Sequence, residues 1–401
     1  MSIKRDITTQ ASKYLESDEI LIFIGSRQSG KTTILKQLIE ILDQKGLKSF
    51  WLNLEDPEYL NLLNENPKNL FKIFTIPPDQ KSYIFIDEVQ YLKNPSNFLK
   101  YLFDEHREQI KLIVSGSSSF YLDNKFKDSL AGRKNIFPVY TLSFREFLRF
   151  KSENDLSEAN LSKLSINDQN KVNLFYREYI NFGGYPKIVL APQEEKIDLL
   201  REIAFSYIKK DIFEAGIRQD EIFYKLFKIL ADQTGNLVNS MELAGTLGVS
   251  KTAIDHYLYA MQKSFHIVLV RPFYKNIRKE ITKMPKVYFL DLGLRNFFTD
   301  NFQAFESRDD KGALLENAVF RQLIEKSQID DIHYWRTTTQ KEVDFVISNE
   351  AFEVKADPQN FNPKKYQEFQ EEYPEINLKI ISFDQKTSSV KSIPIIEPWS
   401  I

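Results

Sequence analysis

The sequence lacks cysteine and is poor in histidine, methionine and tryptophan. Its 401 residues include no cysteine, four histidines, four methionines and three tryptophans. The absence of cysteine excludes disulfides and zinc–thiolate sites. The first ten residues contain no apolar run of the kind found in signal peptides, and no apolar stretch is long enough to span a membrane. We therefore expect a cytoplasmic protein without a membrane segment. The histidines show no metal-ligand spacing (His106, His256, His266 and His333).

An excess of one charge is also missing. The chain has 54 Lys and Arg against 56 Asp and Glu, so its net charge of −2 favours no class of partner. Charge is nevertheless uneven, because residues 271–286 ("RPFYKNIRKEITKMPK") hold six basic residues and one glutamate. Such a run either contacts nucleic acid or forms a solvated loop. The length predicts two to four domains.

A glycine-rich segment follows the first apolar run. In "EILIFIGSRQSGKTTILKQLIEIL" (19–42), the apolar run 20–24 precedes G-x-x-x-x-G-K-T, and helical apolar spacing follows. A strand, loop and helix in this order form a phosphate-binding loop, whose glycines turn N–H groups inward at a helix start. We expect Lys31 to reach the outer phosphates of ATP and the Thr32 hydroxyl to bind Mg²⁺. The predicted nucleotide contacts here are Gly25, Ser26, Arg27, Gln28, Ser29, Gly30, Lys31, Thr32 and Thr33.

A second apolar strand ends in two acidic residues. "YIFIDEVQ" (83–90) places Asp87 and Glu88 at its carboxyl end. Asp87 can hold Mg²⁺, and Glu88 can orient and deprotonate the attacking water. The alternative is an ordinary strand end, since carboxylates also favour the start of a following helix. With the phosphate-binding loop upstream, we predict that Asp87 is a metal ligand and Glu88 the catalytic base.

Two further segments carry candidate nucleotide contacts. The apolar strand in "IKLIVSGSSSF" (110–120) ends in serines, and Ser115, Ser117 or Ser118 can hydrogen-bond the γ-phosphate or the water; Ser117 is the residue that we predict. Serines at strand ends also form turns. "LAGRKNIF" (130–137) contains Arg133, a candidate arginine finger acting in cis or on a neighbouring subunit. An ordinary surface arginine is the alternative.

Together these motifs resemble a known family. The glycine-rich loop, "FIDEVQ", "SGSSS", "LAGR" and "LSFREF" (142–147) are similar to those of prokaryotic AAA+ ATP-binding proteins with a carboxyl-terminal, nuclease-like domain of the DUF4143 type. The resemblance covers most of the chain. It implies that Lys31, Thr32, Asp87 and Glu88 bind and hydrolyse ATP–Mg²⁺. It does not identify a second sensor arginine, although Lys209 and Lys210 in "YIKKDIF" lie where one would be sought.

The middle of the chain reads as mostly helical. Residues 151–171 form a polar insert, predicted to be a loop or a loosely held helix. Two amphipathic helices follow, at about 172–182 and 194–213, and "FGGYP" separates them sharply. These helices resemble the lid that closes an AAA+ nucleotide site.

Residues 221–273 have the pattern of a helix-turn-helix. Ser240 and Ser250 are N-cap candidates, with Gly248 at the turn between two helices. The strand that follows, the basic run and residues 286–291 would then form a wing. A winged helix can bind DNA through its second helix, or it can dock another protein. That helix offers few cations (Lys251, His256 and Lys263), so the expected DNA contact depends mainly on the basic wing.

The carboxyl-terminal third contains a candidate metal site. After a helix at 312–327, "EVDFVISNEAFEVKA" (342–356) predicts two strands, followed by a helix at 362–372 and a strand at 378–383. Side chains two apart on a strand share a face, so Asp344, Glu353 and Lys355 can point the same way. This order resembles the restriction-endonuclease-like core, which implies Glu316, Asp344 and Glu353 as metal ligands and Lys355 as the catalytic lysine. The alternative is the solvated face of an ordinary hairpin.

These predictions combine into one architecture of class α/β. We expect a P-loop AAA+ ATPase core with a parallel sheet at 1–150, a helical lid at 151–216, a winged helix at 217–291 and an α/β restriction-endonuclease-like domain at 292–401. The first functional hypothesis is an ATP-hydrolysing protein, associated with double-stranded DNA, whose nucleotide state controls the winged helix and the nuclease-like tail. The alternative is an ATP-gated module that binds another protein or a second copy of the chain, with a catalytically silent tail.

Overall fold

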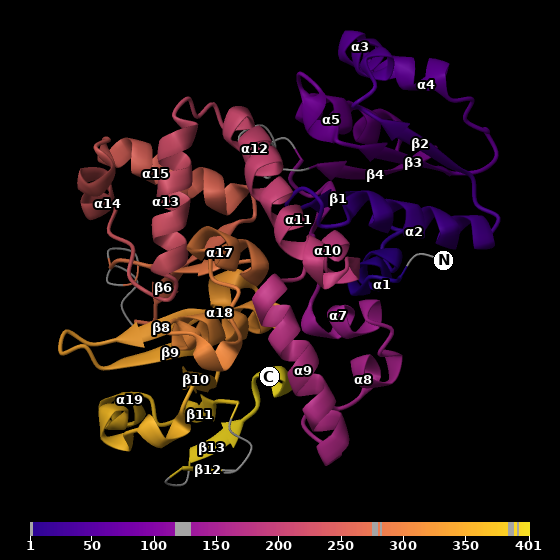
Figure 1. The fold of residues 1–401 in the computed structure, drawn as a ribbon. Helices are drawn as coiled ribbons and strands as arrows, with labels where there is room; N and C mark the ends of the chain where they lie inside the picture. The colour runs from indigo at the N-terminus through magenta and orange to yellow at the C-terminus, as the bar shows by residue number, and fades with distance from the viewer. Residues whose placement is uncertain (1–2, 117–129, 275–279, 281–282, 384–388, 391–392) are drawn as a thin grey trace. The chain divides into compact units, whose positions relative to one another are not determined.

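The computed structural model describes residues 3–116, 130–274, 280, 283–383, 389–390 and 393–401 (Figure 1). The chain forms two compact units. The first extends to Thr141 and includes two short later segments, Glu214–Gly216 and Lys263–Phe265; the second comprises the remaining residues from Leu142 onward. Within the described residues, no helix combines the length and the apolar character needed to cross a membrane.

The first unit is built on a five-stranded sheet in which all pairings are parallel. Its strand order is β2-β3-β4-β1-β5. Strands β1, β3 and β4 are buried along their whole length, as expected of mainly apolar strands that are covered on both faces. This confirms the predicted α/β core with a parallel sheet. The strands are β1 (Ile20–Ile24), β2 (Ser49–Asn53), β3 (Ser82–Asp87), β4 (Ile110–Gly116) and β5 (Lys134–Pro138).

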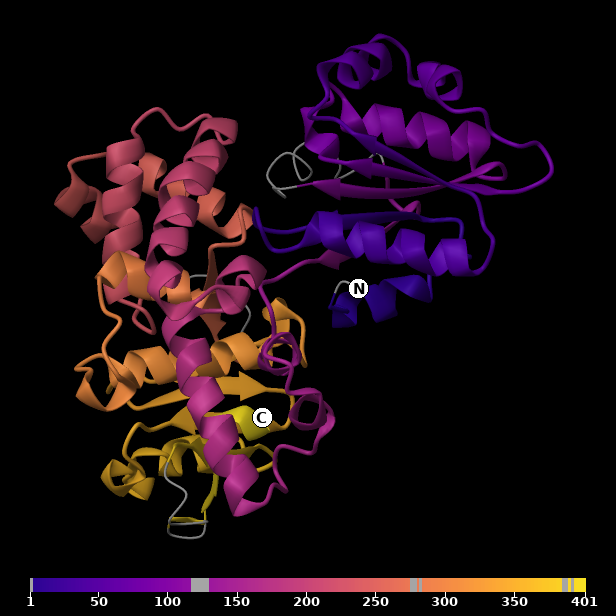
Figure 2. The ribbon, with the colours of Figure 1, turned by 45° about the vertical axis from the view of Figure 1, so that its right-hand side comes forward.

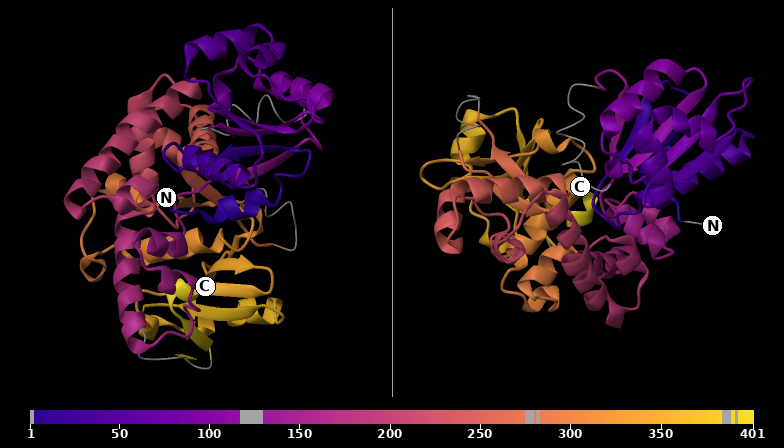
Figure 3. Two further views of the ribbon diagram at one scale, coloured as in Figure 1. Left: turned by 90° about the vertical axis from the view of Figure 1, so that its right-hand side faces the viewer. Right: turned by 90° about the horizontal axis from the view of Figure 1, so that it is seen from above.

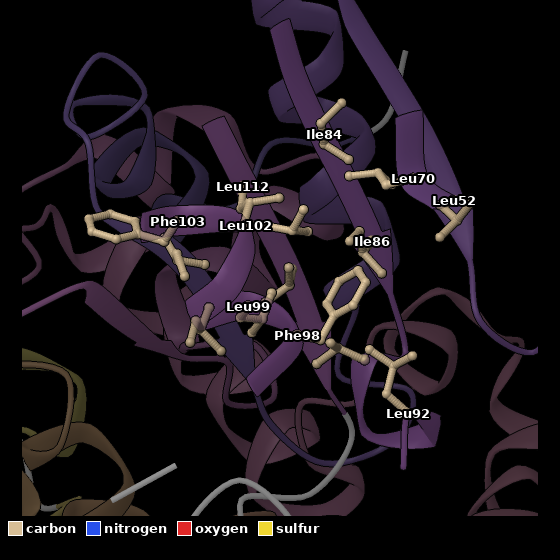
Figure 4. Close-up of a cluster of buried hydrophobic side chains, with 14 of the residues drawn as sticks. Leu52, Leu70, Ile84, Ile86, Leu92, Phe98, Leu99, Leu102, Phe103 and Leu112 are labelled. Atoms are coloured by element: carbon tan, nitrogen blue, oxygen red, sulfur yellow. The ribbon is translucent and has the colours of Figure 1, made fainter. Parts of the chain in front are cut away.

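Helices cover both faces of this sheet (Figures 1 and 2). Side chains alternate between faces along a strand, so Ile84 and Ile86 of β3 pack toward α3, α4 and α5, while Phe85 packs toward α1 and α2. Figure 4 shows the first of these two cores, in which the leucines of α5 meet the isoleucines and leucines of the strands. The helices are α1 (Asp6–Ser12), α2 (Lys31–Gln44), α3 (Pro57–Glu65), α4 (Leu70–Ile73) and α5 (Pro95–His106).

The second unit begins with helices. The predicted helices at 172–182 and 194–213 are α9, which starts earlier, and a helix formed by α11 and α12 with a π-helical turn (Ile203–Tyr207) between them. The polar insert is partly helical rather than a loop, because it contains α8 and the start of α9. These helices are α7 (Phe144–Phe150), α8 (Asn154–Glu158), α9 (Ile166–Phe182), α10 (Pro186–Leu190), α11 (Lys196–Glu202) and α12 (Ile208–Glu214).

Three helices and two strands occupy the region predicted as a winged helix. Ser250 caps the third helix, since its hydroxyl accepts the N–H of Ala253 at 3.1 Å. The second helix starts at Ser240, but its cap is Asn239, which accepts two N–H groups of the first turn. The elements are α13 (Asp220–Asp232), α14 (Ser240–Leu247), α15 (Lys251–Lys263), β6 (Ile267–Pro272) and β7 (Lys286–Phe289).

The two strands of this region belong to a larger sheet. β6 pairs antiparallel with β7 and in parallel with β8. The strands expected to form the wing therefore lie at one edge of an eight-stranded sheet, in the order β12-β13-β11-β10-β9-β8-β6-β7 (Figure 1; Figure 3 gives two further views of the ribbon). The remaining elements are α17 (Leu292–Thr299), α18 (Lys311–Leu323), β8 (His333–Arg336), β9 (Glu342–Ile347), β10 (Glu350–Val354), α19 (Gln367–Glu372), β11 (Asn377–Ile381), β12 (Ser389–Val390) and β13 (Ile393–Ile396).

The predicted hairpin of residues 342–356 is present, but its alternation is broken. β9 and β10 pair antiparallel, with Phe345 opposite Phe352. A register shift between β8 and β9 adds one residue to β9, and Val343 and Val346, three apart, consequently pack in one hydrophobic cluster. Phe345 instead faces Phe320 of α18. Such bulges re-aim neighbouring side chains, here around Asp344.

Candidate functional site

The glycine-rich loop lies between β1 and α2, at the edge of the sheet where the parallel strands end. This edge is where α/β proteins of this kind bind ligands. Gln28 and Gly30 both adopt left-handed backbone conformations, with φ of 62° and 99°. Such turns direct successive N–H groups toward one point, and α2 begins at the next residue, Lys31. The loop therefore has the backbone geometry of an anion-binding cradle.

Gly25 contributes to the loop in a way that differs from our expectation. We expected its backbone torsions to turn N–H groups inward, but its φ is not positive. A Cβ atom at this position would lie 2.1 Å from the carbonyl oxygen of Val139, the residue that follows β5. Gly25 is therefore required by the close approach of a neighbouring segment, whereas Gly30 is required by its torsion angle.

Lys31 lies inside the loop. Its side chain is buried, and Nζ donates to the carbonyl oxygens of Gly25 at 3.0 Å and Ser26 at 2.9 Å. The Ser29 hydroxyl donates to the same Ser26 carbonyl at 2.8 Å. The ammonium group is thus within the cradle, where it can reach an anion. Thr33, another predicted contact, is exposed in the first turn of α2.

Asp87 meets Thr32 beside this loop. The Thr32 hydroxyl donates to Oδ2 of Asp87 at 2.7 Å, and the aspartate is only 3% exposed. Ser115 on β4 donates to the other oxygen, Oδ1, and it is fully buried. We expected a serine of this segment to contact phosphate or water, but the Ser115 hydroxyl is taken by Asp87. Ser117, the serine that we predicted, and Ser118 lie outside the described residues.

Glu88 has an unusual backbone conformation. Its φ and ψ of 58° and 46° are left-handed, which costs a non-glycine residue on the order of 1 kcal/mol. Strain of this kind concentrates at functional sites. The Glu88 carboxylate accepts a hydrogen bond from the buried side chain of Gln90, two residues later. Its predicted role as catalytic base stays a prediction.

Arg5 is a contact of the loop that the sequence did not reveal. Its buried guanidinium donates to the carbonyl oxygens of Ser29 at 2.7 Å and Tyr140 at 3.0 Å. Gln37 of α2 ties down the same amino-terminal segment by accepting the Thr8 hydroxyl at 2.7 Å. Nothing around Arg5 marks it, because its partners are distant in sequence. The weak signal was Gln37, a polar residue on the apolar face of a helix.

Arg133 lies at the other end of the strands from the glycine-rich loop. β5 runs parallel to β1, with Lys134 opposite Ile20, so Arg133 is beside the start of β1. A five-residue strand separates this end from the loop by about 16 Å. Arg133 pairs there with Asp104, Nε to Oδ1 at 2.7 Å. The geometry contradicts a finger acting in cis; action on a neighbouring subunit stays a prediction. Lys209 and Lys210 are exposed on α12, and a sensor role for them also stays a prediction.

The predicted tail residues lie near one another but in two groups. Glu316 of α18 and Asp344 of β9 both face a lysine of β7, Lys286. Glu353 of β10 instead binds Lys355 and accepts the Tyr366 hydroxyl at 2.7 Å. Asp344 connects the groups, since its Oδ2 accepts the backbone N–H of Val354 at 2.8 Å.

Lys286 and Glu342 are members of this cluster that the sequence reading missed. Lys286 Nζ lies 2.6 Å from Oε1 of Glu342, 3.2 Å from Oε1 of Glu316 and 3.8 Å from Oδ1 of Asp344. We had counted Lys286 in the basic run available to nucleic acid, and this was wrong because the side chain is 1% exposed. Among the described residues, no three acidic or histidine side chains are arranged to hold a metal ion. Instead, the three predicted ligands of the tail, Glu316, Asp344 and Glu353, are paired with lysines.

Burial and crowding change the acidities in this cluster. Burial raises the pKa of Glu353 to about 8, and the neighbouring charge of Asp344 adds to the shift although Lys355 opposes it. Burial likewise raises the pKa of Glu316 to about 7, against the effect of Lys286. Four carboxylates face three cations, Lys286, Lys355 and Arg336, the last of which binds Glu342 at 3.0 Å. The four are Glu316, Glu342, Asp344 and Glu353. The cluster is thus close to neutral.

Comparison with protein-family models gives three matches along the chain. Residues 17–148 match an AAA domain, residues 173–304 match a domain of unknown function, DUF8612, and residues 311–396 match another, DUF4143. The first match ends just after the first unit. The second runs from within α9 to just beyond α17 and includes β6 and β7.

Similar chains occur in bacteria and archaea. An uncharacterised protein of Haemophilus influenzae is 28% identical over 368 residues, which cover 88% of this chain and 85% of that one. An uncharacterised protein of Methanocaldococcus jannaschii is 27% identical over 403 residues, covering 96% and 86%.

Solved structures with partial similarity include a replication initiator and an ORC2 protein. Replication initiator DnaA bound to AMPPCP and single-stranded DNA has a TM-score of 0.31 and 12% identity, covering 65% of this chain and 90% of that one. The Aeropyrum pernix ORC2 protein in its ADP form has a TM-score of 0.34 and 15% identity, covering 67% and 87%. The family-model match, the parallel sheet and the glycine-rich loop agree: residues 17–148 carry an AAA-type domain, and residues 311–396 match DUF4143.

Proposed function

We propose that the first unit binds ATP with Mg²⁺ and hydrolyses it. The observation that carries this proposal is the meeting of Thr32 and Asp87, whose oxygens are 2.7 Å apart beside the loop that ends at Lys31. Mg²⁺ prefers oxygen ligands and needs few of them from the protein when phosphates supply others. The AAA-domain match over residues 17–148 supports the same function.

The residues of the glycine-rich loop suit a phosphate group placed beside Thr32 and Asp87. Left-handed turns at Gln28 and Gly30 leave N–H groups directed into the cradle, and the Lys31 ammonium is held there by two carbonyl oxygens. Thr32 and Asp87 would hold Mg²⁺, which when bound spreads the charge of the phosphates. Both donors are oxygens, as the chemistry of Mg²⁺ requires.

Two side chains then act on the phosphates and the water, and a third restrains one of them. Lys31 exchanges its contacts with Gly25 and Ser26 for a phosphate oxygen, and so stabilises the charge that develops in transfer. Glu88 accepts a proton from the attacking water. Because the Gln90 amide holds the Glu88 carboxylate, this hydrogen bond has to break or rotate before Glu88 can do so.

Two substitutions test the proposal. Lys31→Ala is expected to abolish ATP turnover, and Glu88→Gln to retain ATP binding while slowing hydrolysis by about 100-fold or more. Binding is measured by calorimetry and turnover by phosphate release. Lys45→Ala, which removes an exposed lysine just after the same helix, is the control and should change neither. Undiminished turnover in Lys31→Ala overturns the ATP site, and undiminished turnover in Glu88→Gln overturns only the base.

We also propose that nucleotide state controls the second unit, and that double-stranded DNA is its partner. Support comes from the three helices α13, α14 and α15 followed by the β6–β7 pair, and from the basic run between those strands. Lys275, Arg278 and Lys279 of that run lie outside the described residues, so this support comes from the sequence. Steep salt dependence of DNA binding, altered by ATP–Mg²⁺, is the expected result. Binding that does not depend on salt would exclude phosphate contacts.

A specific observation favours a second candidate function for the tail. The carboxylates predicted to hold a catalytic metal are engaged by Lys286 and Lys355. A tail whose acidic residues are neutralised within the fold suits an ATP-gated module that binds another protein. A cleavage assay on DNA, with and without ATP–Mg²⁺, separates the two: absence of cleavage together with capture of a protein partner favours the module.

A further inference from the structure

A buried lysine lies at the centre of the acidic cluster of the tail, which we define as Glu316, Glu342 and Asp344. Its Nζ atom is within 3.8 Å of a carboxylate oxygen of each of the three. These carboxylates come from two elements, α18 and β9, and the lysine comes from a third, β7. The ammonium group is therefore where an inorganic cation shared by these carboxylates would have to be.

The surrounding structure fixes Lys286 in this place. Its backbone pairs with Val270 of β6 on one side and forms a bridge with Leu237 on the other. The ammonium lies 5.5 Å from the centre of the Tyr334 ring, and the whole residue is 1% exposed. Burial lowers the pKa of Lys286, but Glu316, Asp344 and Glu342 raise it above its ordinary value, so the side chain stays charged. It cannot swing into water without unpacking β7.

Other polar groups of the fold also bind these carboxylates. Tyr288 donates to Oε1 of Glu316, the atom that Lys286 contacts. Arg336 binds Oε2 of Glu342 at 3.0 Å, and the Val354 N–H binds Oδ2 of Asp344 at 2.8 Å. A divalent metal needs several oxygens at about 2.0 to 2.6 Å, free of competing cations. The donor set as it stands does not fit a metal.

We propose that Lys286 is the resident cation of the acidic cluster and that its ammonium excludes a divalent metal from the tail. Two consequences follow. The Asp, Glu and Lys pattern at 344, 353 and 355 belongs to a network of ion pairs and hydrogen bonds that links α18, β7, β9 and β10. Removing the ammonium should leave Glu316 and Asp344 unpaired and able to take a metal. This inference does not depend on ATP hydrolysis.

Metal binding to the full-length chain, without nucleotide, tests the inference. The number of bound Mn²⁺ ions is counted by electron paramagnetic resonance in the wild type and in Asp344→Asn. We expect the two counts to be equal, because the wild-type cluster holds no metal; any Mn²⁺ bound near Thr32 and Asp87 contributes equally to both. A wild type that binds one more ion than Asp344→Asn overturns the proposal, and this comparison does not require a variant of Lys286.

The second arm removes the lysine. Lys286→Met keeps the length of the side chain and loses its charge, and we expect it to bind one additional Mn²⁺ and to gain a metal-dependent rise in Tm. Lys286→Arg keeps the charge and should gain neither, and adding Asp344→Asn to Lys286→Met should remove the additional ion. A folded Lys286→Met variant that binds no additional metal overturns the idea that the ammonium is what excludes it.

Discussion

Arg5 shows how one buried residue can set the geometry of a phosphate-binding loop. A peptide unit is planar and trans, so its C=O and N–H groups point in opposite directions. Arg5 holds the Ser29 carbonyl at 2.7 Å, and this fixes the direction of the Gly30 N–H, which shares the same peptide. The guanidinium thus acts on the proposed nucleotide site through the backbone of the loop, as a positioning residue without contact to a ligand.

Arg5→Met is therefore expected to weaken ATP binding. The loss should be roughly tenfold in Kd, the effect of about 1.4 kcal/mol, which is close to the lower end of the range for one hydrogen bond to a charged group. Thr8→Val is the matched control, because it removes the hydrogen bond from the same segment to Gln37 and makes no change in the loop. Calorimetry with ATP and thermal melting together separate the effects: the control should lose stability and keep its affinity. Equal loss of affinity in both variants would mean that Arg5 acts only through the fold.

Lys111 makes the free energy of unfolding depend on pH in the alkaline range. The residue is fully buried at the start of β4, and its ammonium donates to the Ser17 carbonyl at 2.6 Å and to that of Glu19. Burial lowers its pKa to about 8, whereas the unfolded chain keeps a value of about 10.4. Between these values the unfolded state binds more protons, so the contribution of Lys111 to stability rises with pH across this window.

Lys111→Met should remove this contribution. The free energy of unfolding of the wild type minus that of the variant is expected to increase by on the order of 2 kcal/mol from pH 8 to pH 10.4. Taking the difference removes the titration of other groups, such as tyrosines, from the comparison. Urea unfolding at several pH values measures it. A difference that stays constant over this range would show that Lys111 is not desolvated in the folded state.

At the scale of elements, one aspartate connects α9, α10 and α17. Asp291 caps α17 by accepting the Leu294 N–H at 3.0 Å, and it accepts the Gly184 N–H at 2.9 Å in the break between α9 and α10. Gly183 has a φ of 77°, and a Cβ atom there would lie 2.2 Å from Oδ1 of Asp291. The "FGGYP" segment is thus a packing junction as well as a break between helices.

Gly183→Ala should consequently cost at least about 2 kcal/mol of stability, since it combines a left-handed backbone with a collision against Asp291. Gly248→Ala is the control: its φ of 68° is similar, but nothing lies within 4 Å of the added Cβ. That variant should lose only about 1 kcal/mol, the cost of the torsion angle. Chemical denaturation compares the two. Equal losses would show that the junction relaxes around the methyl group.

The sequence predicted elements well where neighbouring residues determine them. The apolar run 20–24 is β1, and the helix after Gly30 starts at Lys31, because strand burial and loop chemistry are local properties. The tail metal site could not be judged in this way. Whether these carboxylates are free to bind a metal depends on Lys286. This lysine is 56 residues before Glu342 and meets it only through the pairing of β6, β7, β8 and β9. The extra residue in β9 also escaped detection, since a bulge leaves the alternation of residue types unchanged.

At the scale of the whole molecule, the distribution of charge bears on the choice of partner. Net charge is nearly zero, so any attraction to DNA has to come from a local surface. Residues 271–286 are the richest basic run that we identified, and burial of Lys286 reduces their available cations to Arg271, Lys275, Arg278, Lys279 and Lys283. This run connects β6 to β7, and so it is attached to the same sheet as the acidic cluster.

Neutralising Lys275, Arg278 and Lys279 together should therefore weaken DNA binding and flatten its salt dependence. Each lost phosphate contact lowers the slope of log affinity against log salt by about 0.9, so the slope should fall by up to about three. A control variant that neutralises three exposed lysines of the first unit, Lys45, Lys68 and Lys100, carries the same change in net charge and should keep the slope. Fluorescence anisotropy with double-stranded DNA at several salt concentrations gives both slopes. Equal slopes for the two variants would assign the basic run to a solvated loop and favour a protein as the partner.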